Sequence, residues 1–223
     1  MKAKITEVFE SIQGEGIYVG EKQLFVRFYD CNLSCSYCDT KPNAYTEYTP
    51  QELFEELTLY SGRYHAIAFT GGEPLLQKDF LKGFLPLTKS AGYKNYLETN
   101  GTLPDELSEV IGNVDIVAMD FKLPSVTGGK DFWEEHREFL RIASQKEVFV
   151  KLVVNTNADD YEVYKALGIV RKINPAAIVV IQPQSQVKGR ALDRKLDWWR
   201  AVCKQEEVAA CVIPQVHKSA GVR

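Results

Sequence analysis

The segment CNLSCSYC, residues 31–38, places three cysteines within eight positions. It directly follows an apolar run, residues 24–29, that is predicted to form a β-strand. The chain has five cysteines, an odd number, and the close spacing of these three is unfavourable for a framework of disulfides. The segment therefore predicts a loop of reduced thiols that bind metal.

Around this loop, apolar runs alternate with stretches of helical period, a pattern typical of an α/β fold with a parallel sheet. Thr49 and Glu52 have the spacing of a capping box at the start of the first helix. We expect strands at 24–29, 66–69, 95–97, 115–119, 148–153 and 177–181, with a short seventh strand at 210–213. We expect helices at 50–60, 78–90, 104–110, 132–143, 160–172 and 192–205. No repeat or flexible linker interrupts the pattern, so residues 1–223 are expected to form a single domain.

The composition excludes several classes of protein. Apolar residues make up 45% and charged residues 26% of the 223 positions, which is ordinary for a globular protein. The net charge is -3 and no long cluster of Lys or Arg is present, so duplex nucleic acid is not expected as a partner. No apolar run is long enough for a membrane span and no signal sequence is visible, so we expect a cytoplasmic protein.

Polar residues follow most of the predicted strands. In parallel α/β folds the carboxyl ends of the strands bind ligands, so six such strands predict an open, partial barrel with one shared mouth. Besides the cysteine loop, the polar residues and glycines at these ends are Thr70, Gly71, Gly72, Glu73, Glu98, Thr99, Asn100, Asp120, Lys122, Asn155 and Gln182.

The three cysteines favour an iron–sulfur cubane over a zinc site. Three thiolates can hold three irons and leave the fourth iron open to a small molecule. A structural zinc site would need a fourth ligand such as a histidine, and none of His65, His136 and His217 has the usual spacing to the cysteines. Cys203 and Cys211 are distant in the sequence, and nothing places either at this loop.

The cysteine motif and the Gly71-Gly72-Glu73-Pro74 turn together resemble the radical S-adenosylmethionine (SAM) superfamily, whose fold is a partial (β/α)6 barrel. The residues around them narrow the resemblance to the family of 7-carboxy-7-deazaguanine synthases. Those residues are ESIQGEG at 10–16, Arg27, Asp39-Thr40 and PQVHK at 214–218. The resemblance implies a lyase of queuosine and deazapurine biosynthesis that converts 6-carboxy-5,6,7,8-tetrahydropterin to 7-carboxy-7-deazaguanine and ammonia. It also implies a 4Fe-4S cluster, SAM and Mg²⁺ as cofactors.

The resemblance implies a role for each matching residue. Cys31, Cys35 and Cys38 would bind the cluster, and Thr40 would bind magnesium. The residues expected to contact SAM are Ser36, Tyr37, Asp39, Gly72, Glu73, Glu98, Asn100, Lys122, Ser125 and Gln182. The residues expected to contact the pterin are Ile12, Gln13, Gly14, Glu15, Arg27, Thr70 and His217.

The sequence around Arg27 indicates a binding role even without the resemblance. It lies inside an apolar strand, where a guanidinium needs an anion, and its fork of donors matches a carboxylate. An outward-facing arginine is the alternative interpretation.

Two alternative functions remain open from the sequence. An activase of glycyl-radical enzymes shares the cysteine and Gly-Gly-Glu-Pro features, but has no use for Arg27 or the loop at 13–15. A non-catalytic zinc or iron–sulfur module is the other. For an enzyme of the resembled family, we expect a small-molecule pterin substrate, flavodoxin or ferredoxin as the external reductant, and a homodimer.

Overall fold

The computed structural model describes residues 1–38, 43–216 and 218. Its strands form one nine-stranded sheet in the order β3-β1-β2-β4-β5-β6-β7-β8-β9. Seven successive strands of this sheet, from β2 to β9, are parallel to their neighbours, whereas β1 is antiparallel to both β2 and β3. The parallel strands are β2 (Lys22–Phe28), β4 (Ile67–Gly71), β5 (Asn95–Thr99), β6 (Ile116–Asp120), β7 (Glu147–Val154), β8 (Ile178–Pro183) and β9 (Ala210–Val212). The antiparallel strands are β1 (Ala3–Ile12) and β3 (Thr46–Tyr48).

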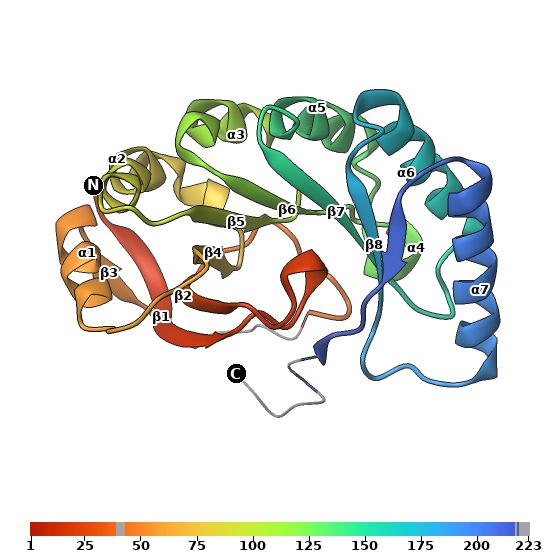
Figure 1. The fold of residues 1–223 in the computed structure, drawn as a ribbon, viewed down its shortest axis with the longest axis horizontal. Coiled ribbons are helices and arrows are strands. Elements are labelled where there is room, and N and C mark those ends of the chain that lie inside the picture. Colours follow the sequence, from red (N-terminus) through yellow and green to blue (C-terminus); the bar gives the residue numbers. More distant parts are fainter. Residues whose placement is uncertain (39–42, 217, 219–223) are drawn as a thin grey trace.

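The helices cover the outer, convex side of the curved sheet (Figure 1). Because β3 and β9 are edge strands, the sheet does not close, and the expected open, partial barrel of parallel strands is confirmed. The α-helices are α1 (Pro50–Thr58), α2 (Lys78–Ser90), α3 (Pro104–Val110), α4 (Pro124–Thr127), α5 (Trp133–Ala143), α6 (Asp160–Ile173) and α7 (Arg190–Gln205). Short 3-10 helices form at η1 (Gly16–Tyr18), η2 (Pro74–Gln77) and η3 (Ile111–Asn113).

The expected strands and helices agree with this architecture, and the structure adds two strands, β1 and β3, and the short helix α4. The Thr49 hydroxyl accepts a hydrogen bond from the Glu52 amide and the Glu52 carboxylate accepts one from the Thr49 amide, so the capping box is confirmed. The sequence interpretation missed β1 and its short partner β3. The burial of β1 only partly alternates, so its sequence gives a weaker signal than the continuous apolar runs of the buried parallel strands.

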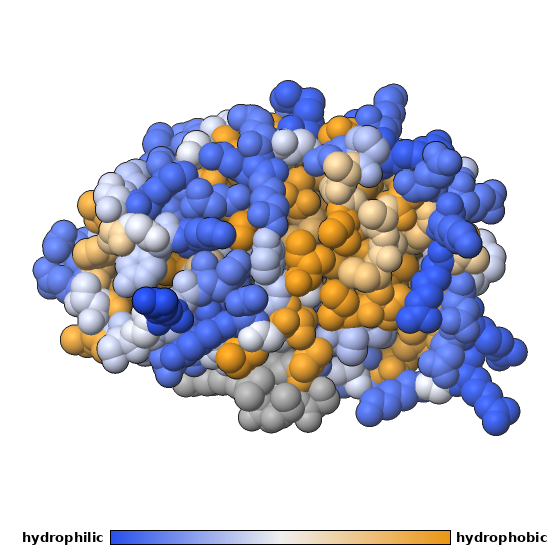
Figure 2. Space-filling view, in the orientation of Figure 1, coloured by the Kyte–Doolittle hydropathy of each residue, from blue (hydrophilic) through white to orange (hydrophobic). Residues whose placement is uncertain are grey.

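Two apolar clusters fill the two faces of the sheet. Alternate residues of β2 divide between them: Leu24 and Val26 pack toward the helices, and Phe25 packs in the second cluster with Tyr96 and Phe149 of other strands. Figure 2 shows apolar side chains gathered in the middle of one face of the molecule, with hydrophilic residues around them. Among the described residues, no helix is both long and apolar enough to cross a membrane.

Candidate functional site

A cavity of about 280 Å³ opens at the carboxyl ends of the parallel strands. The register of the sheet brings distant residues together there, because Arg27 pairs with Thr70 and Asp120 pairs with Lys151 on neighbouring strands. Fifteen of the residues predicted to bind the cluster, SAM or the pterin line this cavity, so the expected shared mouth exists. They are Ile12, Gln13, Gly14, Glu15, Arg27, Cys31, Cys35, Tyr37, Cys38, Thr70, Gly72, Glu98, Asn100, Lys122 and Gln182.

The remaining predicted residues lie elsewhere. Ser36 donates to the carbonyl of Val126 at 3.1 Å, and Ser125 donates to Glu162 at 2.6 Å, so both hydroxyls bond to other parts of the protein. Glu73 lies behind the cavity lining, as described below. The predicted residues Asp39, Thr40 and His217 lie outside the described residues.

The cysteine loop leaves β2, and backbone hydrogen bonds hold its second half. The amide of Ser36 donates to Thr127 of α4 at 3.0 Å, and the amide of Cys38 donates to Cys35 at 3.1 Å. Burial raises the pKa of the Cys35 thiol, and the positive charge of Lys122 opposes this effect. All three loop cysteines are reduced, and each lines the cavity.

The three thiols of the cysteine loop fit an iron–sulfur cubane better than a site for a single metal ion. Within the described part of the chain, no three Cys, His, Asp or Glu side chains converge as ligands of one metal ion. A cubane needs no such convergence, because each thiolate binds a different iron. Cys203 lies in α7 and Cys211 in β9, and neither lines the cavity, so the described residues bring three thiols to this mouth and no fourth.

Gly71 and Gly72 hold the end of β4 against the start of the cysteine loop. A Cβ on Gly71 would lie 2.4 Å from the carbonyl oxygen of Phe28, and one on Gly72 would lie 2.0 Å from that of Asp30. Two backbone hydrogen bonds use this close approach, from Gly72 to Phe28 at 3.0 Å and from Glu73 to Asp30 at 2.7 Å. The glycines therefore serve chain packing at the mouth, and Gly72 also lines the cavity.

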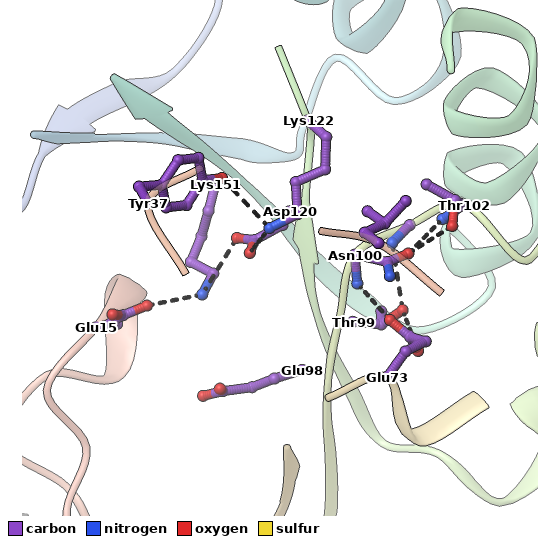
Figure 3. A network of polar contacts seen from close by, with 12 residues as sticks. Glu15, Tyr37, Glu73, Glu98, Thr99, Asn100, Thr102, Asp120, Lys122 and Lys151 are labelled. Carbon is purple, nitrogen blue, oxygen red and sulfur yellow. Dashed lines mark hydrogen bonds and ion pairs between the residues drawn. The ribbon is translucent and has the colours of Figure 1, made fainter. Parts of the chain in front are cut away.

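Glu73 is fully buried and fixes the end of β5. Its carboxylate accepts hydrogen bonds from the hydroxyl of Thr99 and from the amides of Leu75 and Asn100, at 2.9, 3.1 and 2.7 Å (Figure 3). Burial raises the pKa of this carboxyl to about 7, against the lowering effect of the three donors. The side chain of Asn100 in turn donates to Asn32 of the cysteine loop at 2.8 Å. Glu73 thus supports the lining from behind.

We expect Glu73→Gln to lower the free energy of unfolding by about 1–3 kcal/mol, the cost of one buried donor left unpaired. The Leu75 amide donates to one carboxylate oxygen and the Asn100 amide to the other. A glutamine has one oxygen, so in either orientation its NH₂ group faces one of these two amides. Urea unfolding of both proteins measures the difference. Gln51→Glu on the exposed face of α1 is a control for a Gln/Glu exchange and should change stability little.

A buried ion-pair chain crosses the cavity floor. Lys122 lies 2.7 Å from Asp120, and Lys151 lies 3.2 Å from Asp120 and 2.9 Å from Glu15 (Figure 3). Although burial opposes ionisation, the paired charges dominate: they hold the pKa of Asp120 and Glu15 below the ordinary values and raise that of both lysines. Lys122 also lies 5.7 Å from the ring centre of Tyr37. The floor therefore carries fixed charges of both signs.

Lys151 is a cavity residue that the sequence interpretation missed. It lies in the middle of β7, between Val150 and Leu152, and is only 4% exposed. Its sequence context could have identified it, because a lysine inside an apolar strand needs an anionic partner, just as Arg27 does. Its partners come from the loop after β1 and from β6, and a single sequence does not reveal that pairing.

Arg27 lines the cavity and is not an outward-facing strand residue. Its Nε atom donates to Glu7 of β1 at 2.7 Å, so the protein itself supplies one anion for the guanidinium. The sequence did not predict this partner, because it did not predict strand β1. Nearby, Glu98 accepts from Gln13 at 2.8 Å and from Thr70 at 2.8 Å, which joins three predicted residues in one network.

The chain is similar in sequence and in fold to known proteins. A model of the radical SAM superfamily matches residues 25–157. A protein of Geobacter sulfurreducens named 7-carboxy-7-deazaguanine synthase is 36% identical, over 98% of this chain and 97% of the relative. One of Archaeoglobus fulgidus with the same name is 34% identical over 100% of both chains. The crystal structure of QueE from Escherichia coli has the same fold, with a TM-score of 0.69 and 19% identity over 95% of this chain and 94% of that chain.

Proposed function

We propose a function from the premise that this chain belongs to the radical SAM superfamily and, within it, to the family of 7-carboxy-7-deazaguanine synthases. The resemblance expected from the cysteine motif is thereby confirmed. We infer that the chain is a lyase of deazapurine biosynthesis that converts 6-carboxy-5,6,7,8-tetrahydropterin to 7-carboxy-7-deazaguanine and ammonia. The observation that carries this proposal is one cavity lined both by the three thiols and by the Arg27, Thr70, Gln13 and Glu98 group.

The superfamily uses a 4Fe-4S cluster and SAM, and the residues at the mouth suit both. Cys31, Cys35 and Cys38 would hold the cluster. When bound, the cluster supplies the electron that cleaves SAM and generates the 5′-deoxyadenosyl radical. The polar groups around the thiols that would bind SAM are Tyr37, Gly72, Glu98, Asn100, Lys122 and Gln182. We propose Ser36 and Ser125 as further SAM contacts, and Glu73 would support the lining from behind. For Glu73 we propose this supporting role in place of the direct contact with SAM expected from the sequence, because its carboxylate already accepts from three internal donors.

Other residues of the cavity lining suit a pterin. Arg27 would bind the substrate carboxylate through the nitrogens of its fork. The segment from Ile12 to Glu15 offers an amide, a bare backbone and a carboxylate to the donor-rich edge of the ring, and Thr70 lies beside Arg27. We propose His217 as a further contact and Thr40, with Asp39 beside it, as the magnesium site. Magnesium bound there would add charge stabilisation at the substrate.

Three further proposals follow from the family. The chain would act as a single radical SAM domain, receive electrons from a flavodoxin or ferredoxin, and form a homodimer. The proposed reaction involves neither a nucleic acid nor a membrane as a partner.

The test is anaerobic incubation of the reconstituted protein with SAM, reductant, Mg²⁺ and 6-carboxy-5,6,7,8-tetrahydropterin. We expect 7-carboxy-7-deazaguanine and ammonia in equal amounts, and a lower rate when Mg²⁺ is omitted. Cleavage of SAM without any deazaguanine would contradict the proposed substrate and favour the activase alternative. A colourless protein that contains zinc would indicate the non-catalytic module.

We expect Arg27→Lys to raise KM for the pterin about 10- to 100-fold, the equivalent of one lost hydrogen bond between charged groups. Lysine keeps a positive charge near Glu7 but cannot bind a carboxylate with two parallel donors. SAM affinity, measured by calorimetry, should stay close to that of the parent protein. An equal loss of SAM binding and pterin turnover would show that Arg27 supports the fold of the mouth instead.

A further inference from the structure

Behind the substrate side of the cavity, a buried hydrogen-bond relay leads away from the predicted contact residues. Gln13 is 3% exposed, and its Nε2 atom donates to Glu98 at 2.8 Å and to Oε1 of Gln23 at 3.0 Å. Gln23 lies on β2, is fully buried and does not line the cavity. Its Nε2 atom lies 3.1 Å from Nδ1 of His65. The relay therefore runs from the cavity through two amides to a histidine.

In this relay, the donor and the acceptor of each hydrogen bond are fixed by the next hydrogen bond along. An amide NH₂ group only donates, so Nδ1 of His65 must accept, which requires a neutral ring protonated at Nε2. Gln23 then presents its oxygen to Gln13, and both hydrogens on Nε2 of Gln13 are used. The oxygen of Gln13 faces the backbone amide of Glu15 and accepts from it at 3.0 Å. A reversed Gln13 amide would face Glu98 with an oxygen and Glu15 with a donor, so both contacts would be lost.

The backbone of Gln13 cannot move to compensate. Its amide donates to Glu21 at 2.8 Å, and its carbonyl accepts from Gly20 at 2.9 Å. The side-chain amide can turn more easily than this backbone, and its orientation decides whether Gln13 keeps its hydrogen bonds to the Glu98 carboxylate and to the backbone amide of Glu15.

We propose that Gln23 and His65 are positioning residues for the substrate site, and that the neutral ring of His65 sets the orientation of the Gln13 amide. The expected effect on pterin turnover rests on the proposed function. The expected protonation of His65 and the orientation of the two amides do not. Protonation of His65 turns Nδ1 into a donor that faces the Gln23 NH₂ group. Gln23 must then turn, and the reversal reaches Gln13 and the cavity.

The surroundings of His65 favour the neutral form. Its ring lies against Tyr18, with 4.4 Å between ring centres, and its backbone amide donates to Lys22. Burial lowers the pKa of His65, the charge of Lys94 acts in the same direction, and Glu21 and Glu147 oppose it. The neutral form therefore persists to lower pH than in a free histidine, and the relay is expected to reverse only as the pH falls through this lowered pKa.

The structural arm of the test is ¹⁵N NMR of the histidine rings, which is tractable because the chain has three histidines. In the parent protein we expect a neutral His65 with its proton on Nε2. In Gln23→Glu we expect a raised pKa for His65, because the new carboxylate lies beside Nδ1. A proton on Nδ1 in the parent protein would overturn the proposal, and this arm needs no substrate.

The kinetic arm compares two variants with the parent protein. Gln23→Met removes the relay at similar volume and should lower kcat/KM for the pterin by up to about 100-fold. The Kd for SAM should change less, because Glu98 keeps its hydrogen bond from Thr70. In the parent protein, the KM for the pterin should rise as the pH falls and His65 becomes protonated. His65→Gln offers an amide oxygen in place of Nδ1 and does not titrate. This variant should therefore keep the parent activity at high pH and show no such rise in KM at low pH.

A parent-like KM in Gln23→Met, or an unchanged acid-side KM rise in His65→Gln, would overturn the proposal. If Gln23→Met does not fold, the NMR arm and the pH profile of His65→Gln decide. Absence of pterin turnover in the parent protein would contradict the proposed function, and the NMR arm would still test the relay.

Discussion

Replacing Cys35 by alanine is expected to abolish iron–sulfur cluster assembly and, with it, all cleavage of SAM. The described residues bring three thiols to the cavity, each proposed to bind one iron, and supply no substitute when one is lost. Iron and sulfide analysis, the visible absorption spectrum and the 5′-deoxyadenosine yield after anaerobic reconstitution measure the effect. We expect activity at the limit of detection.

The matched control is Cys211→Ala. Cys211 lies on β9 as a free thiol and does not line the cavity, so this variant should keep its iron content and its SAM cleavage. Parent-like activity in Cys35→Ala would refute the cluster assignment. Loss of iron in both variants would show instead that any missing cysteine disturbs the fold.

Lys151→Met is expected to lower the free energy of unfolding by about 3–5 kcal/mol at neutral pH, the cost of breaking a buried ion pair by removing one partner. The ammonium lies between Glu15 and Asp120, so its loss leaves two buried carboxylates with less compensation. Urea unfolding measures this effect. Lys89→Met removes an ion pair of similar length, 3.0 Å to Asp115, at an exposed site, and should cost about 1 kcal/mol or less.

The effect of Lys151→Met should depend on pH in a defined direction. The pKa values of Glu15 and Asp120 are lower in the folded protein than their ordinary values of 4.5 and 3.8. Their contribution to stability is therefore present above those ordinary values and is lost as the pH falls through the folded ones. The gap between parent and variant should narrow as the solution is acidified through this range. A gap that is constant from neutral to acid pH would show that lost packing, not charge, causes the destabilisation.

The chain order of apolar and helical runs predicted most of the fold, because strands buried on both faces are continuous apolar segments that a single sequence displays. The same rule failed for β1, which is only partly buried, and with it the partner of Arg27 was missed. The capping box at Thr49 was predictable because it depends on residues three apart.

The site divides in the same way. The sequence by itself determined the three thiols, the glycine turn and the polar residues that end the strands, because each is a local pattern or lies at a strand end that must face the mouth. Only the tertiary structure decided which groups meet: Lys151 between Glu15 and Asp120, Glu73 behind Thr99 and Asn100, and Gln23 between Gln13 and His65. The physical reason is that a buried charge or amide is defined by its partner, and these partners come from strands and loops far apart in the chain.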